Sequence, residues 1–238
     1  MKILATITLF ILCIASSSAQ KKIKGNGNVV TIERNTGDYD ALRIGGFYEV
    51  ELVEGAEGII TLKGEENILE YLETEVRGRT LVIKSRDNKT LKPSRGEGIY
   101  ITVPVEKIDA IRLSGSGNVV ATKTLEANNF KVHTSGSRRA DLKIDASSVT
   151  VVSSGSSNII LSGNTKRIDI TTSGSSNLRA YELSADKVDI KSSGSSNIQV
   201  TANEGLESRV SGSSNVKYKG NPEKVNTKSS GSGRVSKN

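Results

Sequence analysis

The sequence predicts an all-β protein, in which a parallel β-helix (a β-solenoid) with rungs of about 19 residues follows a β-rich N-terminal region. Apolar and polar residues alternate on both sides of a recurring Ser-Gly motif, as in strands with one buried face. The chain has no tryptophan and only three phenylalanines, which suits a thin core of Val, Ile and Leu. A short repeat cannot bury its own core, so a regular period is typical of stacked repeats. The motif occurs seven times, with its glycines 18 to 21 residues apart: Gly115, Gly136, Gly155, Gly174, Gly194, Gly212 and Gly231.

The first segment of the 238-residue chain is typical of a secretory signal peptide. Lys2 supplies the positive start, and residues 3–14 are almost continuously apolar. We predict cleavage after Ala19, which removes residues 1–19, a segment too short to be a membrane anchor. Cys13 suggests an acylated N-terminus instead, but a leucine precedes it where a lipoprotein signal needs a small residue. The mature chain then has no cysteine, and we expect it in the periplasm, on the outer-membrane surface or secreted.

Residues 20–105 lack the repeat but still indicate β structure. Residues 65–72 predict a short helix, residues 77–79 predict a hairpin turn, and residues 25–28 resemble a degenerate corner motif. We expect this region to cap one end of the solenoid, because open ends expose unpaired strand edges. Four segments alternate or are rich in β-branched residues: 47–53, 59–63, 81–85 and 99–103.

Residues 106–238 predict the solenoid itself. Each repeat consists of a strand, a Ser-Gly-Ser-x-Asn corner, a second strand and a polar return such as residues 162–166. We count positions from the first serine of each motif as zero. Positions −5, −3, +5 and +7 are mostly apolar and should face inward, whereas position −4 is polar and should face outward. Glycine and asparagine suit the corners because they tolerate positive φ. The consensus and helical return of leucine-rich repeats are missing.

Asparagine recurs at position +4 and forms a candidate binding column. Its amides and the adjoining serine hydroxyls could form ladders that present a polar surface to sugar hydroxyls. The alternative is that these side chains only satisfy backbone groups at the corners. Arg139 and Arg234 replace asparagine at two rungs, which weakens the case for one linear ligand. The column consists of Asn118, Asn158, Asn177, Asn197 and Asn215.

An acidic column is the strongest sign of chemistry. Asp169, Asp189 and Glu207 share position −4 on successive rungs, where they could hold Ca²⁺ or serve a carbohydrate-active enzyme. The alternative is neutralisation by neighbouring basic residues on a solvated face: Lys166, Lys187, Lys191 and Arg209.

Other catalytic arrangements find less support. His133 is the only histidine, so a catalytic triad or zinc site would rest on it alone. Seven Ser-Gly-Ser copies also lack the strand-turn-helix setting of a nucleophile elbow. We therefore expect no enzyme, no catalytic residues, no cofactor and no metal.

The net charge of +7 permits acidic glycans or an anionic surface as partners. The basic residues are spread along the chain, however, and such a charge also keeps an edge-rich β protein soluble. Nucleic acid is not expected, because the exported chain has few aromatic residues to stack on bases.

Several segments together resemble the head GIN domain family, named for an auto-transporter adhesin. The resemblance covers nearly the whole mature chain. It implies an exported β-helical protein with an adhesin-like role. The family has no set of catalytic residues that could be assigned to this chain. It rests on Gly-Asn-Gly-Asn at 25–28, F-x-x-V-x-L-x-x-G at 47–55, G-E-E-N-I-L at 64–69, I-T-V-P at 101–104 and the Ser-Gly-Ser repeats.

We expect a non-catalytic envelope or surface protein whose solenoid face binds a glycan or a cell-surface protein. One alternative is a carbohydrate-active enzyme that uses the acidic column. The other is a structural periplasmic module that forms homo-oligomers through the solenoid ends.

Overall fold

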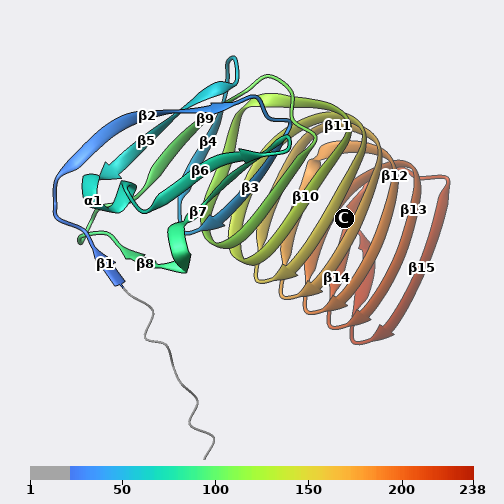
Figure 1. Ribbon diagram of the computed structural model, residues 1–238. Coiled ribbons are helices and arrows are strands. Elements are labelled where there is room, and N and C mark those ends of the chain that lie inside the picture. Colours follow the sequence, from blue (N-terminus) through green and yellow to red (C-terminus); the bar gives the residue numbers. More distant parts are fainter. Residues whose placement is uncertain (1–21) are drawn as a thin grey trace, which may run out of the picture.

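The solenoid is a stack of parallel rungs that turn at the Ser-Gly corners (Figure 1). The computed structural model describes residues 22–238, so the predicted signal peptide lies outside the described residues. Like residues pair in register from rung to rung, for example Asn158 with Asn177 and Gly155 with Gly174. This confirms the all-β solenoid. Its rungs are formed by β10 (Ala110–Gly155), β11 (Asn158–Gly174), β12 (Asn177–Gly194), β13 (Asn197–Gly212), β14 (Asn215–Lys219), β15 (Lys224–Gly231) and β16 (Arg234–Lys237).

The corner glycines stack directly on one another. Gly174 has a φ of 103°, and a Cβ placed on it would lie 2.6 Å from the carbonyl oxygen of Gly155 in the preceding rung. Both the backbone conformation and the close approach therefore require glycine. This is why the motif repeats at every rung.

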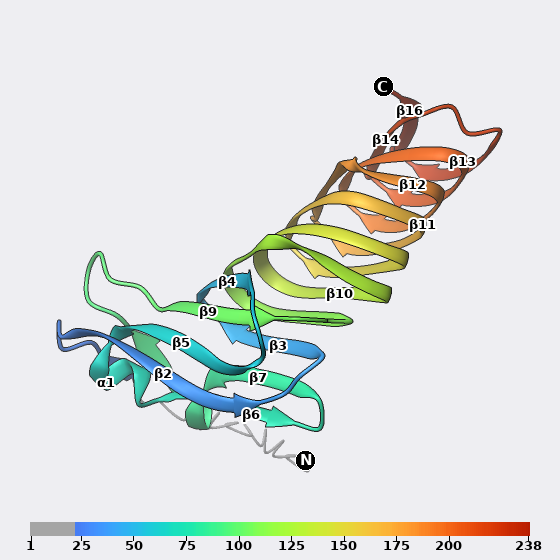
Figure 2. The ribbon, with the colours of Figure 1, turned by 90° about the horizontal axis from the view of Figure 1, so that it is seen from above.

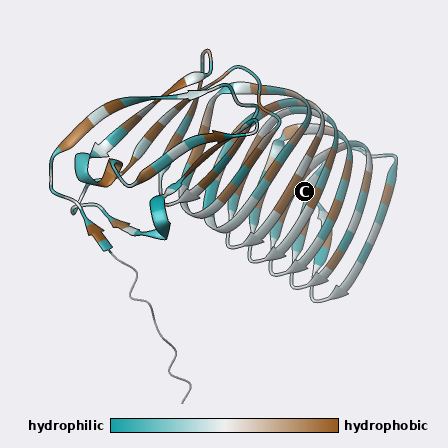
Figure 3. Ribbon diagram, in the orientation of Figure 1, coloured by the Kyte–Doolittle hydropathy of each residue, from teal (hydrophilic) through white to brown (hydrophobic). Residues whose placement is uncertain are grey.

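The predicted inward columns form the core. Ile168 and Ile170 before one corner, and Ile159 and Leu161 after another, are at most 1% exposed. Hydrophobic and hydrophilic residues alternate along the rungs, as Figure 3 shows. One expectation differs: residues 162–166 form no separate polar return, because β11 continues through them to Gly174.

The stack of rungs begins before residue 106. β3 (Ala41–Gly46) and β4 (Glu49–Glu54) pair in parallel with β10, and Gly46 lies in register with Gly115. The degenerate corner is thus at residues 45–49 and not at residues 25–28. Beyond it, β7 (Thr80–Ser85) pairs with β3, and β9 (Tyr100–Val105) pairs with β4, again in parallel. The corner of this rung is replaced by a longer connection that holds η1 (Arg86–Asn88) and β8 (Thr90–Lys92).

Antiparallel strands lie at the N-terminal end of the stack, opposite the C-terminus (Figure 2). β2 (Val29–Gly37) pairs with β5 (Gly58–Glu65), β5 also pairs with β9, and β6 (Leu72–Arg77) pairs with β7. The predicted helix is only one turn, α1 (Glu66–Leu69), because β6 already begins at Leu72. β1 (Lys22–Lys24) pairs with β8. Strands that precede residue 105 pair with β10, which follows it. The predicted division of the chain into residues 20–105 and 106–238 therefore stays a prediction.

No helix within residues 22–238 is long and apolar enough to span a membrane.

Candidate binding groove on one face of the solenoid

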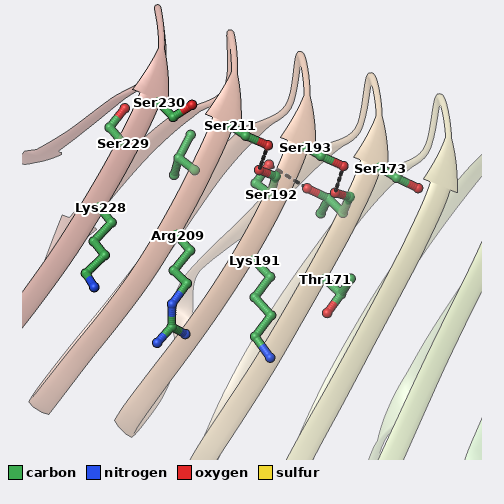
Figure 4. Close-up of a pocket in the computed structure, with 12 residues that line it drawn as sticks. Thr171, Ser173, Lys191, Ser192, Ser193, Arg209, Ser211, Lys228, Ser229 and Ser230 are labelled. Carbon is green, nitrogen blue, oxygen red and sulfur yellow. Dashed lines mark hydrogen bonds between the residues drawn. The ribbon is translucent and has the colours of Figure 1, made fainter.

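Outward side chains at position −2 form a column along one face of the solenoid. Strand register places Lys191 beside Arg209 and Arg209 beside Lys228. Parallel strands are about 4.8 Å apart, so three cationic side chains follow one another at this spacing. Figure 4 shows them in a row on successive strands, with Thr171 next in line. We call Lys191, Arg209 and Lys228 the C-terminal cluster.

A column of serines at position zero lies beside these cations. Together the two columns line a shallow groove of about 420 Å³. Ser211 donates a hydrogen bond to the carbonyl oxygen of Ser192 in the preceding rung, at 3.3 Å. Its oxygen can still accept a hydrogen bond from a ligand, since a hydroxyl both donates and accepts. The groove therefore offers hydroxyl groups at every rung and cationic donors at three successive rungs. The column comprises Ser173, Ser193, Ser211 and Ser230.

The same face carries a second group of basic residues toward the N-terminal end. Arg43 and Arg112 are exposed and lie in register on β3 and β10. His133 holds position −2 in the next rung, and all three residues line a second hollow, also of about 420 Å³. We call Arg43, Arg112 and His133 the N-terminal cluster. The uncharged Val152 and Thr171 occupy position −2 in the two rungs between the clusters.

His133 lies in a positively charged setting. Burial lowers the pKa of its imidazole, and the nearby Arg112 and Lys131 lower this pKa further. The ring is therefore neutral at neutral pH. The sequence predicted an outward histidine without a partner, whereas it is half-buried in the groove among cations.

Most of the clustered cations lack an acidic partner. Arg209 pairs with Glu207, at 2.5 Å from Nη2 to Oε1. Among residues 22–238, no ion pair involves Arg43, Arg112, Lys191 or Lys228.

The acidic column has the predicted register but is neutralised by arginines. Asp169 lies beside Asp189, and Asp189 beside Glu207. Arg167 Nη2 donates to Asp169 Oδ1 at 2.8 Å and to Asp189 Oδ2 at 2.6 Å. Its hydrogen bond to Asp169 is the main cause that raises the pKa of Arg167. The sequence anticipated Arg209 but not Arg167. The described part of the chain contains no group of three or more potential metal ligands.

The asparagine column lies on the other side of the corner. Asn158, Asn177, Asn197 and Asn215 occupy four successive rungs in register. Asn118 stands apart from them and donates from Nδ2 to Glu49 Oε2 at 2.8 Å. Ligand binding by this column stays a prediction.

The family is decided by a match over most of the chain. The family model described as "putative auto-transporter adhesin, head GIN domain" matches residues 38–222, which include the N-terminal rungs. The chain belongs to the head GIN domain family.

Solved structures share the fold of this GIN domain protein. A putative adhesin from Bacteroides fragilis has a TM-score of 0.83 at 21% identity, over 91% of this chain and 100% of that chain. A putative lipid binding protein from Parabacteroides distasonis has a TM-score of 0.75 at 23% identity, over 92% and 100%. No curated protein matches the sequence.

Part of the predicted serine surface of this GIN domain protein lies inside the solenoid. Thr172 and Ser192 share a hydrogen bond of 2.7 Å between their hydroxyls, and Ser192 donates to Ser214 at 2.8 Å. All three side chains are buried. They hold positions −1 and +3, where the period-two alternation of the inward columns continues. The same alternation in the sequence identifies these three residues as inward-facing.

Proposed function

We propose that this GIN domain protein is an exported, non-catalytic, adhesin-like surface protein that binds an extended glycan along the groove. The observation that carries the proposal is the alignment of a cation column and a serine column on one face of the solenoid. Hydroxyl and ammonium groups can hydrogen-bond sugar hydroxyls and acidic groups. Because a serine recurs at each rung and cations at three successive rungs, a repeating polymer fits the groove better than a single small molecule.

The state of the acidic side chains supports a non-catalytic role. Asp169 and Asp189 share one arginine, and Glu207 pairs with another. A glycosidase uses two carboxyl groups that flank the scissile bond, whereas these carboxylates are each held by an arginine. His133 lies among cations, and within residues 22–238 no carboxylate hydrogen-bonds its imidazole to orient it as a base.

A lipid ligand, suggested by the name of the Parabacteroides protein, is less well supported. Lipid chains require an apolar cavity. The large apolar side chains that are exposed within residues 22–238 lie outside the groove: Val29, Ile59, Tyr100, Val120 and Val225.

A glycan array with the mature protein tests the proposal. The groove variant is Lys191→Ala/Arg209→Ala/Lys228→Ala. Its matched control, Lys143→Ala/Arg179→Ala/Lys217→Ala, removes the same charge from exposed residues outside the groove. We expect the wild type and the control to bind a glycan and the groove variant to bind it weakly. No glycan binding by the wild type would contradict the proposal and favour a structural module.

A second variant tests the asparagine column. If Asn177→Leu/Asn197→Leu abolishes glycan binding while the groove variant keeps it, the binding face is the asparagine column and the groove assignment fails. Surface proteolysis of intact cells tests the location, since protection of the protein would argue against adhesion.

A further inference from the structure

We infer that the ligand is a linear acidic polysaccharide whose carboxylate or sulfate groups are bound by both cationic clusters. This inference rests on the proposed function and names the ligand class for the same groove. Its basis is that the two clusters lie in one column of position −2 side chains, on one face of the solenoid.

The length of the column favours a polymer. Eight residues, from Arg43 to Lys228, occupy successive rungs of this column, and seven steps of about 4.8 Å give a length of about 34 Å. Arg112 and Lys191 are four rungs apart, or about 19 Å. One small anion cannot contact both clusters, whereas one chain can. Binding at the second cluster is then intramolecular, which strengthens binding overall.

The charges of the column favour an anion. Like charges on neighbouring strands repel one another. Lys191 and Lys228 flank Arg209, and of these three cations only Arg209 has an acidic partner among the described residues. At the other cluster, Arg43 and Arg112 are adjacent, and the exposed Lys131 of position −4 adds a third cation nearby. A bound polyanion relieves this repulsion at both clusters.

The composition of the groove argues against other polyanionic partners. A membrane-binding surface combines basic residues with apolar or aromatic side chains that insert into the bilayer. Single-stranded nucleic acid is held by aromatic side chains that stack on the bases. No phenylalanine, tyrosine or tryptophan among the described residues lines either hollow. Cations and hydroxyl groups in one line match an acidic polysaccharide.

The test measures binding of the full mature chain to alginate, to dextran sulfate and to uncharged dextran. We compare wild type, Arg43→Ala/Arg112→Ala, Lys191→Ala/Arg209→Ala/Lys228→Ala and the control Lys143→Ala/Arg179→Ala/Lys217→Ala. We expect each cluster variant to lower the affinity for at least one acidic polymer about tenfold and the control to change it by less than about threefold. Short oligosaccharides of the same polymer, which contact only one cluster, should be affected by one cluster variant and not by the other.

Each outcome separates the inference from the proposed function. If the wild type binds neutral glycans but neither acidic polymer, the glycan function stands and the inference is wrong. If the acidic polymers bind all four proteins equally, the clusters are not the site. If the wild type instead binds vesicles of phosphatidylcholine and phosphatidylserine, and only the cluster variants lose this, the partner is a membrane. Circular dichroism and thermal unfolding of each variant confirm that the fold is retained.

Discussion

The buried guanidinium of Arg138 donates two hydrogen bonds to the carbonyl oxygen of Ser114, at 2.8 Å from Nη2 and 3.1 Å from Nε. Arg138 is 1% exposed and occupies position +3, where the four following rungs have serine. Longer hydrogen bonds reach the carbonyl oxygens of Ile44 and Tyr48 on the N-terminal rung. Gly117, at the same position in the preceding rung, has no side chain. Arg138 therefore joins two rungs of the repeats to the N-terminal rung.

We expect Arg138→Ser to lower the free energy of unfolding by about 2–4 kcal/mol. The substitution removes a large buried side chain together with its hydrogen bonds to three carbonyl oxygens. Urea denaturation followed by circular dichroism measures the change. Arg139→Ser, at the exposed neighbouring position, should change stability by less than about 0.5 kcal/mol. Equal effects of the two substitutions would show that the contacts of Arg138 do not stabilise the fold.

We expect Gly174→Ala to destabilise the solenoid by at least about 2 kcal/mol, because it adds a Cβ at positive φ and against the Gly155 carbonyl. Gly205→Ala is the matched control. Its Cβ would have no neighbour closer than 4.0 Å, and its φ is not in the left-handed region. Thermal unfolding of both variants checks the prediction. A Gly174→Ala protein as stable as the control would contradict the role given to the glycine column.

The carboxylate of Glu65 should make stability depend on pH. Burial alone would raise its pKa, but hydrogen bonds from Ser94 and from the Gly27 amide outweigh burial, and the pKa lies below its ordinary value. A lowered folded-state pKa stabilises the protein above the unfolded-state pKa, and this stability is lost as the pH falls through the folded-state pKa. The carboxylate accepts from Ser94 N at 2.7 Å, Ser94 Oγ at 2.6 Å and Gly27 N at 2.5 Å.

Glu65→Gln should therefore be less stable than wild type at neutral pH, and its stability should fall less between neutral pH and about pH 3. Urea denaturation at a series of pH values measures this difference. Glu70→Gln, on an exposed side chain of the same segment, should follow the wild-type curve. If the stability of Glu65→Gln changed with pH in parallel with that of the wild type, this carboxylate would not be the source of the pH dependence.

His133 should make polyanion binding depend on pH. Its pKa is lowered in the free protein by burial and by Arg112 and Lys131, and Arg43 lies one rung beyond Arg112. A bound sulfate favours the protonated imidazole and raises this pKa, so binding takes up a proton and affinity rises as the pH falls from about 7 to about 5. Dextran sulfate keeps its own charge over this range. Titrations should show a smaller rise in affinity for His133→Asn, and an identical rise in both proteins would contradict the prediction.

The sequence predicted the rungs well because their physical requirements recur in every copy. Each corner needs glycine at positive φ, and each strand needs alternate apolar residues, so both appear as a period. The rung at residues 41–54 was missed because its corner is Gly-Gly-Phe-Tyr and lacks the serines of the motif. The next rung was missed because residues 86–99 replace its corner.

The groove was harder to predict because its residues share a position and not an identity. Position −2 holds arginine, histidine, valine, threonine and lysine in different rungs, and only the strand register shows that they form one line. Asparagine at position +4 was conspicuous because it repeats. The arginine that neutralises Asp169 and Asp189 was missed, because its contact with Asp189 joins two different rungs.

Calorimetric titration of dextran sulfate into wild type and into Lys191→Glu/Arg209→Glu/Lys228→Glu tests the central claim most directly. We expect saturable binding by the wild type, weaker binding at higher salt, and loss of most of the affinity in the charge-reversed variant. Affinity that is unchanged in a correctly folded variant would show that the groove is not the binding site.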